Sequence, residues 1–431
     1  MPKLFGAALL ALALAAATPT SATAAAPVPA DAPTTAAFAT ATQSDQIPGR
    51  YIVTLKDAAV QSDTTATVNA AVAQATSMGA TVRHVYRHAL HGYSAAMSKS
   101  AAAALADDPR VQSVQPERRV RALAQTVPTG VDRVEADLSP TAAIDGKDTR
   151  VDVDVAVIDT GVDMNHPDLN VYKAGAKNCW FPWLPVLDMH GHGSHVAGTI
   201  GALDNNTGVV GVAPGARIWP VQVLNPLGLG TTADVVCGID YVTQHADQID
   251  VVNMSLGGSG SDDGKCGTVN NDAMHRAICA SVAAGVTYVV AAANSHADAK
   301  NTTPAAYDEV ITVSALADFD GKSGGLGKAS CRADRDDTFA DFSNYGADVD
   351  LIAPGVCIRS TYRNGGYAVL SGTSMASPHV AGGAALYKAT HPGASPAAVK
   401  AALVAAGGTD WLWPSEDGDN TKEPLLRLRG F

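Results

Sequence analysis

The run VDVAVIDTG at residues 153–161 decides the fold class of this chain. Its centre is continuously apolar and rich in Val and Ile, which is typical of a strand buried on both faces. Three further runs share this character and are separated by helix-like stretches: ARIWPVQVL at 216–224, IDVVNMSLGG at 249–258 and TYVVAAAN at 287–294. Buried strands alternating with helices predict an α/β fold, in which helices flank a parallel β-sheet on both faces.

Polar residues close three of these runs, namely Asp159, Ser255 and Asn294. In parallel sheets of this kind, functional residues collect at the carboxyl ends of the strands. A carboxylate at the end of a buried strand is costly unless it is paired or hydrogen-bonded. Asp-Thr-Gly is, however, equally good turn chemistry. A function for Asp159 therefore depends on finding its partners.

Three histidines lie close together in MHGHGSHVAGT, residues 189–199: His190, His192 and His195. One hypothesis makes them the zinc site of a metal-dependent hydrolase. The hydrolytic zinc motif, however, places two histidines four residues apart on a helix, with a glutamate beside the first. Here His192 and His195 are three apart and Gly and Ser stand between them. The spacing therefore favours a proton-carrying histidine over a metal site.

The stretch GTSMASPHVAGGAALYKAT, residues 372–390, offers a partner for such a histidine. A long Ala-rich helical stretch follows Ser374, and Pro378 is expected close to the start of this helix, where its missing N–H costs nothing. Ser374 then lies at a helix N-terminus, where free N–H groups favour developing negative charge. An isolated serine there would be an ordinary N-cap, so the assignment depends on joint occurrence with other motifs.

Three motifs occur together in the order Asp, His, Ser: DTGVDMNHPDL (159–169), HGSHVAGT (192–199) and SGTSMASPHVAG (371–382). In this order they closely resemble the subtilisin-like serine proteases, or subtilases. The resemblance extends over about residues 128–410. It implies the subtilisin-like form of the α/β fold predicted above.

The resemblance implies a catalytic triad of Asp159, His192 and Ser374. His192 would act as general base toward Ser374 and then as general acid toward the leaving amine, while Asp159 holds its imidazole in the right tautomer. His195 would be a structural neighbour, and His190 receives no role.

The same resemblance implies an oxyanion donor and a substrate site. Asn294 matches the asparagine whose side-chain amide donates to the oxyanion. The family has Gly before this Asn, where this chain has Ala293, and the extra methyl should narrow the pocket for the residue before the scissile bond. The substrate would bind as an extended strand between two Gly-rich strands, residues 227–230 and 255–258. With Ala293, the expected substrate-binding residues are Gly228, Leu229, Gly230, Ser255, Leu256 and Gly257.

A structural calcium site is a further implication of the resemblance. LDNNTGV at 203–209 aligns without gaps to the calcium loop of the family. The expected ligands are oxygen atoms, as calcium prefers: the carbonyls of Leu203, Thr207 and Val209 and the side chains of Asp168 and Asn205. The alternative is that NNTG is an ordinary turn.

Residues 46–122 are predicted to form a separate small α+β domain. GRYIVTL (49–55) and HGYSAAMS (91–98) have the alternation of strands, residues 64–78 are Ala-rich and helical, and residues 100–116 suggest a helix, a turn and a strand. The domain resembles the inhibitory propeptide of subtilases. We therefore expect self-cleavage within 120–127 and a catalytic domain over 123–431.

Residues 1–26 have one Lys followed by an apolar run that is too short to span a bilayer, with small-residue sites after it, and are predicted to be a secretory signal peptide. Residues 27–45, rich in Ala, Thr and Pro, are expected to be an unstructured spacer. No longer apolar span follows, so we expect no membrane anchor.

Export to an oxidising compartment suggests up to three disulfides among the six cysteines. The sequence alone does not fix their connectivity. Pairing near neighbours would give Cys266–Cys279 and Cys331–Cys357, which leaves Cys179 for Cys237. The net charge of −12 argues against a nucleic-acid partner.

The sequence therefore predicts a secreted serine endopeptidase, made as a self-processed zymogen and acting as a monomer. Its partners would be protein and peptide substrates and its own propeptide. The alternative hypothesis is a catalytically silent subtilase fold that serves as a binding protein.

Overall fold

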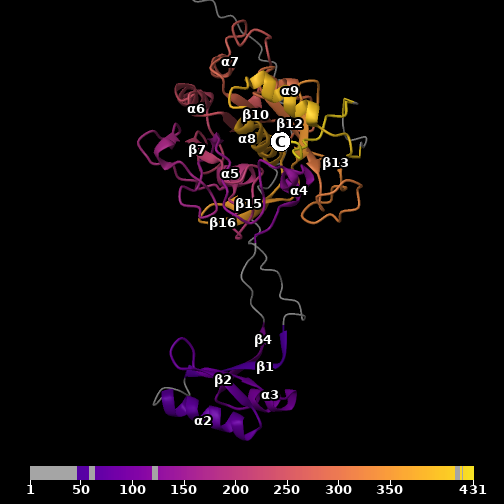
Figure 1. The fold of residues 1–431 in the computed structure, drawn as a ribbon. Helices are drawn as coiled ribbons and strands as arrows, with labels where there is room; N and C mark the ends of the chain where they lie inside the picture. The colour runs from indigo at the N-terminus through magenta and orange to yellow at the C-terminus, as the bar shows by residue number, and fades with distance from the viewer. Residues whose placement is uncertain (1–45, 58–63, 119–124, 413–417, 420) are drawn as a thin grey trace, which may run out of the picture. The chain divides into compact units, whose positions relative to one another are not determined.

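The computed structural model describes residues 46–57, 64–118, 125–412, 418–419 and 421–431. These residues form two compact units, described separately below (Figure 1, with the first unit in indigo). The predicted signal peptide and spacer, and residues 120–124 of the expected cleavage region, lie outside the described residues. Within the described part of the chain, no helix is both long and apolar enough to cross a membrane.

The N-terminal unit is a four-stranded antiparallel sheet with the strand order β2-β3-β1-β4 and two helices. The elements are β1 (Gln46–Leu55), α2 (Thr64–Ser77), β2 (Thr81–Tyr86), β3 (Gly92–Ala96), α3 (Lys99–Ala106) and β4 (Val111–Arg118). Val53, Val68 and Tyr93 form the centre of its core. The predicted small α+β domain is confirmed, and β2 is the strand that the sequence analysis did not identify.

The larger unit is built on an eight-stranded sheet with the order β13-β12-β10-β8-β5-β7-β6, in which β14 also pairs with β12. All pairings are parallel except that of β13 with β12. The strands are β5 (Asp154–Asp159), β6 (Lys177–Asn178), β7 (Arg217–Gln222), β8 (Val251–Met254), β10 (Thr287–Ala291), β12 (Ile311–Ala317), β13 (Thr338–Phe339) and β14 (Leu351–Pro354). The predicted parallel sheet is therefore present.

Helices cover both faces of this sheet because successive side chains of a strand point to opposite faces. Val155 and Val157 share a core with α5 and α8, whereas Ala156 and Ile158 share another with α6 and α7. The helices of this unit are α4 (Thr129–Arg133), α5 (His192–Gly201), α6 (Thr232–Gln244), α7 (Ala273–Ala283), α8 (Thr373–Thr390) and α9 (Pro396–Ala406).

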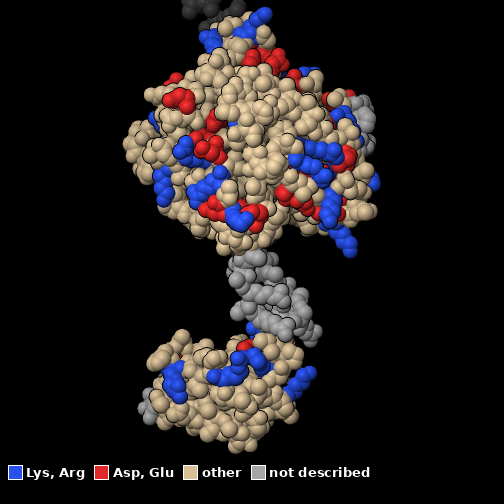
Figure 2. All heavy atoms as spheres, viewed as in Figure 1, with Lys and Arg blue, Asp and Glu red and all other residues tan. Residues whose placement is uncertain are grey.

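Two small strand pairs complete the larger unit. They are β9 (Gly258–Ser259) with β11 (Thr302–Thr303), and the hairpin of β15 (Ile358–Tyr362) with β16 (Gly366–Leu370). Single turns of 3₁₀ helix cover Ala136–Leu138, Lys173–Gly175 and Ala299–Asn301. On the face shown in Figure 2, acidic and basic side chains are interspersed over the larger unit, whereas Lys and Arg predominate on the N-terminal unit.

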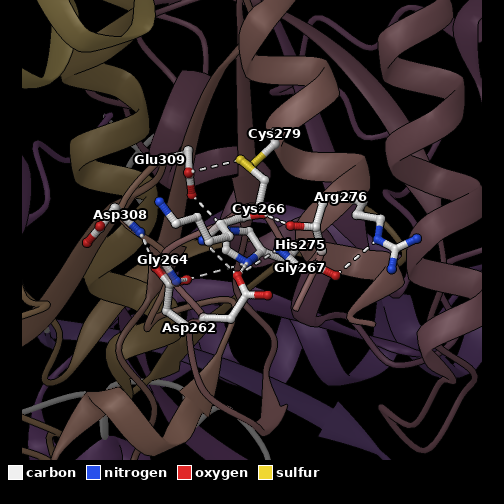
Figure 3. The surroundings of a disulfide bond; sticks show 12 residues. Asp262, Gly264, Cys266, Gly267, His275, Arg276, Cys279, Asp308 and Glu309 are labelled. Atoms are coloured by element: carbon white, nitrogen blue, oxygen red, sulfur yellow. Dashed lines mark hydrogen bonds and ion pairs between the residues drawn. A yellow bond between two sulfur atoms is a disulfide. The ribbon is translucent and has the colours of Figure 1, made fainter. Parts of the chain in front are cut away.

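Three disulfides join all six cysteines, and all of them lie in the larger unit: Cys179–Cys237, Cys266–Cys279 and Cys331–Cys357. The predicted pairing is therefore present. Figure 3 shows the surroundings of the second bond, which ties the loop before α7 to that helix. Beside it, His275 is fully buried, its Nε2 lies 2.9 Å from a Glu309 carboxylate oxygen, and its ring stacks on Tyr307.

Candidate active site

Asp159 and His192 meet where the end of β5 adjoins the start of α5. Asp159 is fully buried, and its two carboxylate oxygens lie 2.8 and 2.9 Å from Nδ1 of His192. The two elements approach closely because Gly193 has no side chain: a Cβ there would lie 2.4 Å from the carbonyl oxygen of Gly161. The sequence motifs predicted this pair, and the fold brings its two side chains together.

The charge of Asp159 controls the protonation of His192. Burial lowers the pKa of His192, but the negative charge of Asp159 and its hydrogen bond outweigh burial and leave the pKa above its usual value. The side chain of His192 keeps 19% of its surface exposed, so the imidazole is accessible from outside.

The other two histidines of this motif have different surroundings. His195 is buried within α5, where its Nε2 lies 2.9 Å from the carbonyl oxygen of Ile358, and burial lowers its pKa to about 3. The rings of His190 and His192 are 6.1 Å apart and at a steep angle. Because His192 faces Asp159 while His195 faces Ile358, their ring nitrogens do not converge on a shared ion. This geometry gives no support to the zinc hypothesis.

Ser374 is the second residue of α8, where backbone N–H groups have no acceptor within the helix. Pro378 was expected close to the helix start, but it is the sixth helical residue, inside the second turn. Because proline has no N–H, the carbonyl of Ser374 lacks the regular helical bond from residue 378. The hydroxyl of Ser255 donates to this carbonyl instead, at 2.9 Å.

A chain of buried hydrogen bonds supports this contact. The hydroxyl of Ser377 donates to Oδ1 of Asn253 at 2.7 Å, and Nδ2 of Asn253 donates to the hydroxyl of Ser255 at 2.9 Å. The hydroxyl of Ser374 donates back to the carbonyl of Ser255 at 3.3 Å. Among the described residues, this is the hydrogen bond that the hydroxyl of Ser374 donates, and no hydrogen bond joins this hydroxyl to His192.

Asn294, which follows β10, is oriented by the first residue of α8. Both the backbone N–H and the hydroxyl of Thr373 donate to Oδ1 of Asn294, at 2.8 and 2.9 Å. The amide oxygen of Asn294 therefore already accepts hydrogen bonds. Its side chain is exposed, so its Nδ2 group can donate to a ligand. The preceding residue, Ala293, has a φ of 83°, a left-handed conformation that glycine adopts without strain.

The first expected substrate segment is exposed, whereas the second begins with the buried Ser255, and residues 227–230 and 255–257 form no regular strand. Leu227 and Leu229 are 77% and 63% exposed, and Oδ1 of Asn225 accepts bonds from both of their backbone N–H groups. This side-chain contact holds residues 227–230 as a turn. The second segment, residues 255–257, connects β8 to β9, and Gly257 is exposed.

The expected calcium ligands surround one buried carboxylate. Asp168 is 1% exposed and accepts bonds from Nδ2 of Asn205, the backbone N–H of Val209 and the hydroxyl of Tyr367, all neutral groups. Burial raises its pKa. A buried carboxylate bonded to neutral donors fits a site that holds a cation.

Gln125 belongs to the same oxygen cluster, although the sequence analysis did not include it. Its side-chain Nε2 lies 2.6 Å from the carbonyl oxygen of Leu203 and 3.1 Å from that of Val209, so two expected carbonyl ligands converge on one point. The sequence gives no signal for this contact, because Gln125 lies 78 residues before Leu203.

Comparison with known proteins agrees with this geometry. Residues 151–424 match the model of the subtilase family, and residues 50–123 match that of the peptidase inhibitor I9 family. The chain is 40% identical over 281 residues to subtilisin DY of Bacillus licheniformis, covering 64% of this chain and 90% of that protein. It is 36% identical to the extracellular serine proteinase of a Thermus species, covering 84% of this chain and 85% of that protein.

A solved structure supports the same relationship. The crystal structure of a cold-adapted subtilisin-like serine proteinase matches with 32% identity and a TM-score of 0.50, and the match covers 70% of this chain and 98% of that chain. The chain belongs to the subtilase family: it is a serine endopeptidase with an I9-type propeptide domain before its catalytic domain.

Proposed function

We propose that the chain is a secreted, self-processing zymogen in which Asp159, His192 and Ser374 hydrolyse peptide bonds through an acyl-enzyme. The contact of Asp159 with Nδ1 of His192 carries this proposal, because it leaves Nε2 as the nitrogen that accepts the proton of the nucleophile. Ser374 is the nucleophile that fits, since it stands at the start of α8, which packs against α5.

The reaction begins when the hydroxyl of Ser374 turns from the carbonyl of Ser255 toward His192. Hydrogen bonds of catalytic groups are often formed only when substrate binds. Nε2 of His192 takes the hydroxyl proton while Oγ of Ser374 attacks the scissile carbonyl carbon. The tetrahedral intermediate collapses when His192 returns this proton to the leaving amine, and water then releases the acyl group by the same route.

Nδ2 of Asn294 and the backbone N–H of Ser374 would stabilise the oxyanion of the intermediate. Thr373 supports this role, because its two bonds to Oδ1 of Asn294 fix which end of the amide faces the substrate. Donors that are oriented before the reaction need no reorganisation when the charge develops. The substrate would lie along residues 228–230 and 255–257, beside Ala293.

The residues around Asp168 would hold a structural calcium ion. The proposed ligands are the carboxylate of Asp168, Oδ1 of Asn205 and the carbonyls of Leu203, Thr207 and Val209, to which we add the side chain of Gln125. When bound, the ion would supply the positive charge that this buried carboxylate lacks.

Processing would remove the signal peptide (1–26) and then cut the chain within 120–127. The mature enzyme would be a monomeric domain of about residues 123–431. Support comes from the propeptide match and from the two separate compact units. The relatives include an extracellular proteinase, which favours secretion.

The test is Ser374→Ala in the full chain. We expect the purified variant to keep its N-terminal 120 or so residues and not to react with a serine-directed phosphonate. The wild type should lose these residues and should be labelled by the phosphonate. The alternative of a catalytically silent binding protein is not supported, because the chain belongs to a family of serine endopeptidases. A folded wild type that is neither processed nor labelled would contradict the proposed triad.

A further inference from the structure

A pocket of about 800 Å³ lies beside the start of α5. Its walls come from residues 163–165, residues 173–178, the loop over 182–189 and the turn of the β15–β16 hairpin. No sequence motif predicts a role for this pocket, and it lies outside the two segments proposed above for the substrate backbone.

The charged groups of this pocket leave it cationic. Lys173, Lys177 and Arg363 line it, and in the described part of the chain none of the three forms an ion pair with a carboxylate. Lys173 donates to the side-chain carbonyl of Asn165, Lys177 lies over the ring of Tyr241, and Arg363 donates to the backbone carbonyl of Met189.

The two acids of the lining, Asp163 and Asp188, form no ion pair with these cations, and their carboxylates bond the backbone instead. Asp163 accepts the N–H groups of Asn165 and Gly365. Asp188 accepts those of residues 190, 191 and 194 at the start of α5, together with the hydroxyls of Thr160 and Ser194. Three lysine and arginine side chains against two carboxylates leave the lining with an excess of positive charge in a chain whose net charge is −12, and this excess favours an anionic group.

The lining also contains exposed apolar side chains. Leu184, Leu187 and Met189 are 46%, 53% and 49% exposed, and all three line the pocket. Trp183, from the same loop, is 76% exposed. A lining that carries both cations and exposed apolar side chains complements a ligand with a carboxylate next to a large apolar group.

The pocket borders the proposed catalytic residues. Met189 directly precedes His190, and a Cβ at Gly228 would lie 3.4 Å from Nε2 of His190. His190 thus separates the pocket from the substrate segment 228–230. Asp188 also holds the backbone of the turn that presents His192. A peptide that lay along residues 228–230 and continued past His190 would come next to the pocket residue Met189.

We infer that the pocket is a substrate subsite that selects an acidic residue, Asp or Glu, next to a large apolar residue. This inference rests on the proposed function, since it assigns the substrate preference of the same site. It makes Lys173, Lys177 and Arg363 determinants of specificity that do not take part in the bond-breaking step.

The experiment uses internally quenched peptides that contain Leu-Glu or Leu-Gln at successive positions around one cleavage site. We expect the wild type to have about a fivefold higher kcat/KM for the Glu peptide at one or two positions at low salt, and a smaller advantage in 0.5 M salt, because salt screens exposed charges. Lys173→Gln and Arg363→Gln should each reduce this advantage, with the loss confined to Glu peptides.

Lys328→Gln is the matched control, since Lys328 is an exposed lysine outside the pocket and the charge change is the same. Equal cleavage of Glu and Gln peptides at every position would overturn the inference. An equal loss on both peptides in the pocket variants would also overturn it, because it would indicate general damage. A third outcome would also overturn it: the wild type has no peptide preference but binds anionic lipid vesicles, and the two variants lose this binding. The pocket would then be assigned to a membrane surface.

Failure of the proposed function is distinguishable from failure of this inference. If the wild type cleaves no peptide, the Ser374→Ala protein still tests the pocket through its Kd for the Glu and Gln peptides, measured by fluorescence polarisation. A Kd about fivefold lower for the Glu peptide, lost in Arg363→Gln, supports the subsite. Equal Kd values overturn it.

Discussion

At the scale of single residues, the carboxylate of Asp159 controls when His192 can accept a proton. If His192 is the general base, as proposed, it must be neutral to act, so we expect activity to rise as the pH rises through the pKa of His192 and to be lost below it. Since Asp159 holds this pKa above its usual value, the acid limb of the pH profile lies at a higher pH than for an unpaired histidine.

Replacing Asp159 by Asn tests this control. We expect kcat to fall by about 10⁴-fold, the order associated with the carboxylate of such triads. The acid limb of the remaining activity should move to lower pH, because the negative charge that raises the pKa of His192 is gone. Steady-state assays over a range of pH would measure the fall in kcat and the position of the acid limb of kcat/KM. Asp341→Asn, at an exposed acid paired with Arg332, is the control. An acid limb that stays in place in Asp159→Asn would contradict the assignment.

Ala293 is a second residue with a measurable consequence. Its φ of 83° is costly for a residue with a Cβ, so Ala293→Gly should stabilise the protein by about 1 kcal/mol, even after the extra entropy of glycine in the unfolded chain. The wider pocket should also raise kcat/KM for peptides with an aromatic residue before the scissile bond. Thermal unfolding and peptide kinetics would check the two effects, and Ala297→Gly is a nearby comparison. A less stable Ala293→Gly variant would show that its conformation is not strained.

Residue roles were predicted only where a motif carried them, and these roles stay predictions. The motifs predicted that Asp159 and His192 act together, and the fold brings their side chains into contact. The orientation of Asn294 could not be predicted, because it depends on Thr373, which lies 79 residues later in the sequence. Contacts between distant residues of ordinary type leave no local pattern.

At the scale of elements, an irregularity in the second turn of α8 connects this helix to the residue that follows β8. Pro378 removes the helical bond to the carbonyl of Ser374, and Ser255 at the end of β8 replaces it. The proposed nucleophile is thereby tied to a strand of the sheet as well as to its own helix.

The third prediction concerns the hydrogen bond from the hydroxyl of Ser255 to the carbonyl of Ser374. In Ser255→Ala, the carbonyl of Ser374 and Nδ2 of Asn253 lose their partner, which should cost about 1–3 kcal/mol of stability. The kcat should fall more than KM rises, because the nucleophile is positioned less well. Urea unfolding and steady-state kinetics measure these effects, with Ser259→Ala in the exposed strand β9 as control. Unchanged stability and kcat would show that the bond has no positioning role.

The elements themselves were largely predictable from the sequence. Continuous apolar runs identified β5, β7, β8 and β10, because strands buried on both faces need no alternation. The segment 227–230 was expected as a strand but is a turn, since the side chain of Asn225 takes the backbone N–H groups that a strand would offer to a neighbour. Pro378 was expected nearer the helix start because its compensating partner, Ser255, comes from another element.

At the scale of the whole molecule, the proposed calcium site concerns stability more than chemistry. Gln125, the first described residue of the larger unit, contacts the loop 203–209 in this cluster. An ion there would connect the beginning of the unit to the end of α5. Bound calcium at 100 times its Kd would stabilise the folded state by about 2.7 kcal/mol.

Calcium removal is the fourth prediction. A chelator should lower the Tm of the wild type and shorten its lifetime, while kcat measured at once at a permissive temperature stays unchanged. Asp168→Asn should start from a lower Tm that the chelator does not change further. Thermal unfolding with and without added calcium would measure this. A wild type whose Tm ignores both chelator and calcium would exclude the site.

The placement of the disulfides has a consequence for the release of the mature enzyme. Because all three bonds lie within the larger unit, a single backbone cut between the units leaves no covalent link between them. The two products should therefore migrate as separate bands on a denaturing gel run without reductant. Departure of the N-terminal fragment would be a reversible equilibrium, sensitive to dilution and independent of the redox state of the medium.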